Sequence, residues 1–404
     1  MVQRLAAVLL LLLSAQGVRA QLDPTKRELI QLGYNTALQG HAPLSAYAFY
    51  YGNLPNFYKS NLTLRIAIAP VYLDSEVGLV SLLGEYTDLG LGISGGGFAD
   101  SYAEIRQGKF LREESFTGHG GGLSASVYHL FNPGHLIPLN GLARVEFHQA
   151  FYARDKETAA NFELPPDESA FNFRTGFRFG GREPLIFPEV AMELSAWYEG
   201  MFRLEPSAYG YSGDREINQA SHLLWARALL AYTFPKTKQS FNVSLTGGAS
   251  LHADRFSAYR LGGILPMAAE FPLTLPGYYY QEISAEKFVL FGGQYSIPLG
   301  LRRQWALNFL AATAGVEYLP GLEQPGRWHS GVGAGIIYRS PKDAWQLLVG
   351  YAYGIDAIRD NGRGAHSIGF LLQFDLDRGH RNLFDPAEQP LRSRGLERIY
   401  RFFE

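Results

Sequence analysis

Few residues in the chain have the types and spacings that catalysis requires. The string His119-Gly120-Gly121-Gly122 matches the oxyanion loop of some lipases, which works with a serine on a strand-to-helix turn of an α/β fold. Glycine that gives backbone clearance at the mouth of a strand explains this string better. The 10 histidines form no H-E-x-x-H motif, and the absence of cysteine excludes thiolate metal sites and cysteine nucleophiles. We therefore predict a protein that is not an enzyme and holds no cofactor or metal.

Charged side chains form a second group of candidate functional residues. They share one face of segments in which apolar and polar residues alternate with a period of two. In Phe171 to Phe179, for example, phenylalanines alternate with Asn172, Arg174, Gly176 and Arg178. The charges predicted to lie on the inward face are Arg65, Arg144, Glu146, His148, Arg174, Arg178, Glu193, Glu199 and Arg227. An inward charge must be paired or hydrated. Charges of both signs could therefore line a polar channel, or they could pair across it and close it.

The same alternation predicts strands from about Ala46 onwards. A soluble sandwich also alternates, but it buries its apolar face and exposes the polar one to bulk water. Here the segments are long and aromatic, with 24 Tyr and 27 Phe in 404 residues, and they follow an export signal. We therefore predict an all-β fold, a transmembrane outer-membrane barrel with apolar side chains toward lipid and polar or glycine positions toward the lumen.

About sixteen strand-like segments can be counted, and an even number of antiparallel strands is usual in bacterial barrels. They are centred near Ala48, Ile66, Leu79, Leu91, Glu104, Ala125, Phe147, Thr175, Ala196, Ala228, Leu245, Leu290, Ala311, Gly335, Gly350 and Leu371. Short periplasmic turns are predicted at Tyr72 to Ser75, Phe98 to Ser101, Phe234 to Lys238 and Ser340 to Asp343, with long polar surface loops between them.

The chain divides into four predicted segments. Residues 1–20 form a signal peptide, with a short apolar core and a small-x-small cleavage site at Val18-Arg19-Ala20. Residues 21–45 form a periplasmic segment in which Asp23-Pro24 would cap a short helix over about Thr25 to Leu38. Residues 46–376 form the barrel, and residues 377–404 form an Arg-rich periplasmic tail. The expected location is the bacterial outer membrane, and the net charge of -2 gives no reason to expect a nucleic-acid partner.

Ser367 to Phe374 matches the terminal signal of outer-membrane barrels, with Gly369, Leu372 and Phe374 at its glycine, hydrophobic and aromatic positions. An alternating closing strand offers the barrel-assembly machinery an edge to pair with during biogenesis. The lipid bilayer and this machinery are therefore the expected partners. The tail is either a solvated periplasmic segment, or a helix over Leu391 to Phe403 that binds a periplasmic protein, peptidoglycan or the anionic membrane surface.

A long proline-rich loop lies within the stretch from Arg260 to Leu299. Leu261-Gly262-Gly263 opens the loop, Leu275-Pro276-Gly277-Tyr278 marks its tip, and Gln294 to Leu299, which includes Pro298, ends the next strand. These motifs resemble the bacterial surface antigen superfamily of outer-membrane barrels (BamA and TamA type). Its members include assembly factors, two-partner secretion transporters and patatin-fused barrels. The resemblance implies a barrel whose long surface loop folds into the lumen.

The chain departs from the family's pattern at the charged contact that holds this loop. The family's loop-tip arginine is Pro276 here, its acidic partner on the wall aligns with Thr313, and the glutamate that ends the strand is Gln294. Loss of both partners is physically consistent, because either one left alone and buried would cost several kcal/mol. We therefore expect Gly277, Tyr278 and aromatic packing to hold the loop, without a charged latch.

The resemblance implies a role in translocation or insertion of proteins or other substrates at the outer membrane. It also implies a weak seam between the first and last strands, near Tyr47 to Tyr51 and Ile368 to Phe374. Residues 21–45 leave no room for the family's periplasmic POTRA domains, so we expect a member without them whose partners act in trans. Two alternatives stay open: a passive solute pore, and a non-transporting surface or anchor barrel.

Overall fold

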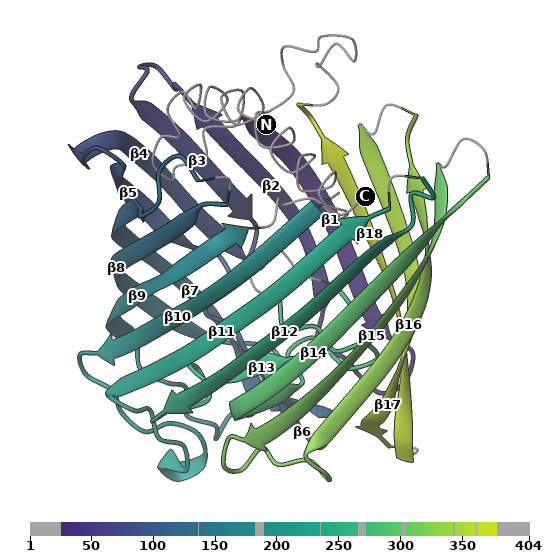
Figure 1. Cartoon of the computed structure of the whole chain (residues 1–404). Helices are drawn as coiled ribbons and strands as arrows, with labels where there is room; N and C mark the ends of the chain where they lie inside the picture. The colour runs from purple at the N-terminus through teal and green to yellow at the C-terminus, as the bar shows by residue number, and fades with distance from the viewer. Residues whose placement is uncertain are drawn as a thin grey trace, which may run out of the picture.

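An antiparallel sheet closes on itself to form a barrel (Figure 1). The structure is a computed structural model that describes residues 26–135, 137–181, 190–234, 236–265, 272–300, 304–341, 344–360 and 362–377. Eighteen strands belong to the sheet, but the short strands β6 and β13 lie beside β7 and β14 without joining the wall, which leaves sixteen in the closed barrel. The predicted all-β barrel and its strand number are confirmed.

The elements, in chain order, are β1 Arg27–Ala37, β2 Ser45–Pro55, β3 Leu62–Ala69, β4 Tyr72–Gly84, β5 Thr87–Gly96, β6 Tyr102–Arg106, β7 Lys109–Leu130, β8 Leu139–Arg154, β9 Glu168–Gly181, β10 Val190–Arg203, the 3-10 turn η1 Tyr211–Gly213, β11 Ala220–Thr233, β12 Ser240–Leu251, β13 Tyr259–Leu261, β14 Ile283–Leu299, β15 Trp305–Tyr318, β16 Trp328–Arg339, β17 Trp345–Arg359 and β18 Gly362–Asp375.

The two faces of the wall follow the predicted alternation. Phe171, Phe177 and Val349 point outward and are 45–55% exposed, as lipid-facing side chains are in a protein without its bilayer. Their inward neighbours are buried, for example Gln346 and Ala352 on β17. Among the described residues, no helix has the length and apolarity needed to cross a membrane.

The predicted helix over about Thr25 to Leu38 is wrong, because Arg27–Ala37 is the wall strand β1. It pairs with β2 on one side and with β18 on the other. Backbone groups in a bilayer must find partners, and a helix at this place would leave the edges of β2 and β18 open. The barrel wall therefore begins at Arg27 rather than at residue 46. The predicted signal peptide and the Arg-rich tail beyond Asp377 lie outside the described residues.

The segment near Glu104, predicted to be a wall strand, is β6, a short strand that forms a hairpin with β7 and is not part of the barrel wall. The strand number is right because this extra strand offsets the missing β1. Because β1 was missed, the prediction also placed the turns near Tyr72 and Phe98 at the opposite end of the barrel from the one where these residues lie. Tyr72 to Ser75 begins β4, and Phe98 to Ser101 leads from β5 to β6. The turns predicted after Thr233 and Arg339 do connect neighbouring strands.

The two ends of the barrel differ in their connections. The first and last wall strands start and finish at one end, where Leu29 lies opposite Asp375, and we call this the terminal end. The long connections lie at the opposite end, which we call the loop end (Figure 1). The seam between the first and last strands is β1 with β18, from Leu29 opposite Asp375 to Ala37 opposite Ser367. The predicted seam placed Tyr47 to Tyr51 beside β18 and is wrong, because these residues belong to β2 and pair with β1.

Candidate functional site: the loop within the lumen

The described parts of the connection between β12 and β14, residues 252–265 and 272–282, fold back into the barrel at the loop end. Its strand β13 pairs with the start of β14, and Gly263 and Leu275 form a two-residue bridge that closes the loop on itself. The tip, Leu275-Pro276-Gly277-Tyr278, is buried, with Leu275 and Tyr278 at 0% exposure. It belongs to one apolar cluster with the inner wall, formed by Trp197, Trp225, Phe288, Leu290, Ala312, Ala314, Val316, Ala357 and Ala365.

Glycine at the tip is required by a close approach to the wall. Gly277 has φ +85, and a Cβ there would lie 1.9 Å from the backbone nitrogen of Gly354 on β17. On β16, a Cβ at Gly331 would lie 2.0 Å from the carbonyl oxygen of Pro276. The loop tip and the two strands therefore meet backbone to backbone, which only glycine allows.

A chain of hydrogen bonds joins Tyr278 to the wall. The Tyr278 hydroxyl lies 3.1 Å from Nδ1 of His329, and Nε2 of His329 contacts the Tyr318 hydroxyl. Tyr318 donates its own proton to the Gly326 carbonyl at 2.7 Å, so it must accept from Nε2–H of His329. His329 Nδ1 then accepts from Tyr278. Burial raises the pKa of Tyr278 above its ordinary value.

A buried ion pair also holds the loop, although a loop without a charged contact was expected. Arg359, at the end of β17, donates two hydrogen bonds of 2.9 Å to the carboxylate of Glu282. Both side chains are buried, at 2% and 0% exposure. The positions expected to have lost the family's charged contact make neutral contacts: Thr313 with Ser330, and Gln294 with Asn308. The wall thus supplies the cation and the loop supplies the anion.

The remaining predicted loop residues have structural contacts. Arg260 of β13 donates to the carbonyl of Ala103 at 2.7 Å and lies over the ring of Tyr102, which ties the loop to β6. A Cβ at Gly262 would lie 2.1 Å from the carbonyl oxygen of Tyr279, so this glycine also marks a close approach. Pro298 lies opposite Ala306 in the β14–β15 ladder.

The predicted inward charges pair along the wall rather than across the lumen. Arg65 and Arg144 both reach Asp74, at 3.2 and 3.0 Å, and Arg227 makes two hydrogen bonds to Glu193. The other pairs are Glu146 with Arg144 and Ser94, His148 with Asp100, and Arg174 with Glu199. Arg174 and Arg178 also lie over the ring of Trp197. These charges therefore interact with neighbours along the wall. The sequence pattern placed Asp74 and Asp100 in turns, but Asp74 contacts two of these arginines, and both carboxylate oxygens of Asp100 contact Nε2 of His148.

The residues of the closing signal lie in β18, against β1. Gly369 lies opposite Asn35, Leu372 opposite Leu32, and Phe374 opposite Ile30. The signal thus occupies the seam of the finished barrel.

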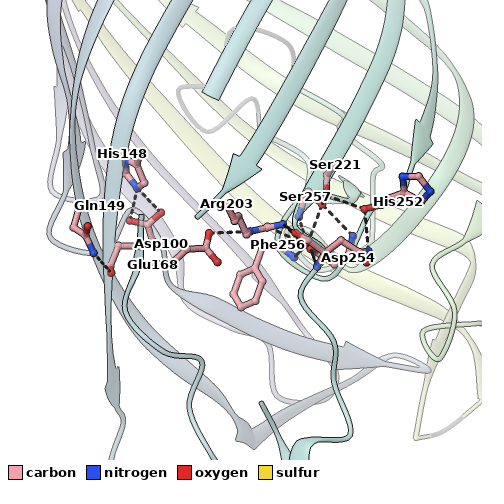
Figure 2. A network of polar contacts seen from close by, with 12 residues as sticks. Asp100, His148, Gln149, Glu168, Arg203, Ser221, His252, Asp254, Phe256 and Ser257 are labelled. Carbon is pink, nitrogen blue, oxygen red and sulfur yellow. Dashed lines mark hydrogen bonds and ion pairs between the residues drawn. The ribbon is translucent and has the colours of Figure 1, made fainter. Parts of the chain in front are cut away.

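A cap of surface connections lies next to the loop, and the sequence pattern gave no sign of it. Arg203 stands between Glu168 and Asp254, at 2.8 and 2.7 Å, and Asp254 also accepts from Ser257 (Figure 2). Beside this network, side chains from β6, from the start of β7 and from the β8–β9 and β10–β11 connections form an apolar cluster of Tyr102, Phe116, Phe162, Tyr209 and Ile217. These residues are far apart in the sequence, so no local spacing could have grouped them.

The lipase-like string lies on a flat strand. His119 to Gly122 belong to β7, and the one serine string that fits such an active site, Gly92-Ile93-Ser94-Gly95-Gly96, lies in β5. The Ser94 hydroxyl donates to Glu146 rather than to a histidine, which is not the arrangement of a nucleophile and its base. Within the described part of the chain, no group of three or more His, Cys, Asp or Glu side chains could hold a metal ion.

The fold and the buried loop together define a closed sixteen-strand transmembrane barrel whose lumen contains its own surface loop. No family model and no curated protein sequence matches the chain. Among solved structures it is similar to CdiB from Acinetobacter baumannii, with a TM-score of 0.56 and 11% identity over 87% of this chain. It is also similar to BamA from Haemophilus ducreyi lacking POTRA domains 1-3 (TM-score 0.55, 11% identity) and to CdiB from Escherichia coli (0.55, 12%), again over 87% of this chain.

The chain spans 60% of the Acinetobacter CdiB chain, 70% of the BamA chain and 63% of the Escherichia CdiB chain. At these identities the likeness concerns the fold of the barrel.

Proposed function

We propose that the chain is a barrel of the bacterial surface antigen type that translocates or inserts substrates, proteins foremost, at the outer membrane. The observation that carries this proposal is the loop after β12, which returns into the lumen and buries its tip against β16 and β17. A loop held within the lumen obstructs free diffusion, so we expect passage to require movement of the loop or opening of the wall. The likeness to BamA and CdiB barrels supports the proposal at the level of the fold.

The route we propose is the seam between β1 and β18. Its ladder has nine residue pairs, from Leu29 to Ala37, and the neighbouring β2–β3 ladder has six, from Tyr50 to Pro55. The β14–β15 ladder has fourteen pairs between Ala285 and Leu299. The β2–β3 ladder is shorter still, but a connection joins its two strands, whereas β1 and β18 are the first and last strands and can part without any turn between them. Because every backbone group in a bilayer needs a partner, the nine pairs of the seam also leave fewer groups for a substrate strand to satisfy than a ladder of fourteen.

Depletion of the protein, followed by a census of outer-membrane proteins and lipids, tests the function. We expect specific proteins to be lost, and expression of the wild-type chain to restore them. A variant with Thr36→Cys and Ile368→Cys, which lie opposite each other across the seam, should fail to restore them until it is reduced. The chain has no other cysteine, so the crosslink is unambiguous.

The matched control places the same crosslink in another ladder. Ala196→Cys with Ala226→Cys joins β10 to β11, where the two residues also lie opposite each other, and should restore the depleted proteins fully. An active seam-locked barrel would contradict the seam mechanism. An unchanged outer membrane after depletion would contradict the function itself.

A passive solute pore is the second candidate, because charged and polar side chains line the inner wall. Replacing residues 264–280 by a Gly-Ser bridge removes the loop but keeps β13, since Gly262 already lies beside Gln281. In planar bilayers we expect the wild-type barrel to be silent and the shortened barrel to conduct. Stable conductance of the wild type would favour the pore, and a silent shortened barrel would indicate that the cap alone closes the lumen.

A further inference from the structure

The ion pair between Glu282 and Arg359 joins the loop to the wall at a single guanidinium. Besides its two bonds to Glu282, Arg359 donates from Nη2 to the carbonyl of Gly277 at 3.4 Å. The ring of Tyr279 lies over the guanidinium, with its centroid 3.7 Å from Cζ. The backbone N–H of Tyr279 donates to Glu282 at 2.7 Å. One wall residue therefore organises the loop from Gly277 to Glu282.

Tyr279 extends this contact to the seam. Its hydroxyl donates to the carbonyl of Gln39, just after β1, at 3.1 Å. The next residue, Gly40, has φ +71, and a Cβ there would lie 2.2 Å from the Tyr279 hydroxyl oxygen. The tyrosine therefore presses closely on the connection that leaves β1.

The connection after β1 is in turn bonded to β18. Leu38 donates its N–H to the carbonyl of His366 at 2.8 Å, and the side chain of Gln39 accepts from the N–H of His366 at 3.3 Å. These two bonds continue the β1–β18 ladder past its last residue pair, Ala37 opposite Ser367. A continuous path thus runs from Arg359 through Tyr279 and Gln39 to the loop end of the seam.

We propose that the Glu282–Arg359 pair is a latch through which the loop keeps the loop end of the β1–β18 seam closed. The bonds to Glu282, the bond to Gly277 and the stacked ring share one buried guanidinium, so they form and break as a unit. Removing one charge leaves its partner buried and uncompensated, and departure of the loop relieves this. Tyr279 then leaves Gln39, and the seam loses its outermost support. This inference deepens the proposed function, on which its biological meaning rests.

Backbone hydrogen exchange of the purified full-length barrel, read by mass spectrometry, tests the latch. In Glu282→Gln, we expect the amides of Leu38 and His366 to exchange about tenfold faster, while those of β10 and β11 are unchanged. Lys287→Gln is the matched control, since Lys287 and Glu317 form an exposed ion pair at the same end of the barrel, with both side chains 52% exposed. Its exchange should match the wild type.

Tyr279→Phe separates the latch from general loss of folding. It keeps the ring over Arg359 and removes only the hydroxyl that reaches Gln39, so Leu38 and His366 should exchange faster while the amide of Tyr279 stays protected. A Glu282→Gln barrel with unchanged exchange at Tyr279, Leu38 and His366 would overturn the latch. Faster exchange at Tyr279 without any change at Leu38 and His366 would overturn the coupling to the seam. Neither measurement uses a substrate, so these outcomes are distinct from failure of the proposed function.

Discussion

Gly277→Ala is expected to expel the tip of the long loop from the lumen. A methyl group at Gly277 would lie 1.9 Å from the backbone nitrogen of Gly354, which the β16–β17 ladder fixes in place. The residue also has φ +85, which costs a non-glycine residue roughly 1–2 kcal/mol. Because the wall cannot yield, the loop must. Chymotrypsin should then cleave the variant after Tyr278, Tyr279 or Tyr280, whereas the wild-type barrel should resist cleavage at these residues.

Gly134→Ala separates the clash from the backbone strain. Gly134, in the turn between β7 and β8, has φ +82 and no atom within 4 Å of an added Cβ. This variant has the same strain without the clash, and it should keep the wild-type resistance at Tyr278 to Tyr280. Equal cleavage of the two variants would mean that the tip of the loop does not depend on its approach to β17.

The wall was predictable from sequence where the alternation is unambiguous. Trp345 to Tyr353 indicates a strand, because large apolar residues alternate with small or polar ones at every position except Leu348. Arg27–Ala37 is different, since Leu29, Ile30, Tyr34 and Ala37 also share one face of a helix. Its conformation is decided by β2 and β18, which each need a partner for one edge. That requirement comes from the closed barrel and cannot be inferred from a short stretch of the sequence.

The candidate site was predictable only in part, for a similar reason. The glycines and Tyr278 at the loop tip stand in a recognisable motif, so the sequence indicated where the loop would turn. The ion pair that holds the loop joins residues 77 positions apart, and its polarity is the reverse of the one that the resemblance suggests. Once Pro276 and Thr313 had replaced the expected partners, no local feature distinguished Glu282 and Arg359 from other charges.

Arg203→Met is expected to destabilise the loop end of the barrel by about 3–5 kcal/mol, the range for breaking a buried ion pair by removing one partner. The Arg203 side chain is 0% exposed and bonds Glu168, Asp254 and the carbonyl of Asn218. Methionine fills a similar volume but leaves two carboxylates without their cation. Urea unfolding of the barrel in lipid should therefore show a lower midpoint, with loss of the cap preceding loss of the wall.

Arg112→Gln tests whether the loss of stability in Arg203→Met depends on the burial of the ion pair. Arg112 makes two hydrogen bonds to Glu157 at the same end of the barrel, but the two side chains are 45% and 57% exposed. Exposed pairs contribute about 0–1 kcal/mol because water and salt screen them, so the unfolding midpoint should barely move. Equal effects of Arg203→Met and Arg112→Gln would mean that the Glu168–Arg203–Asp254 network does not hold the cap together.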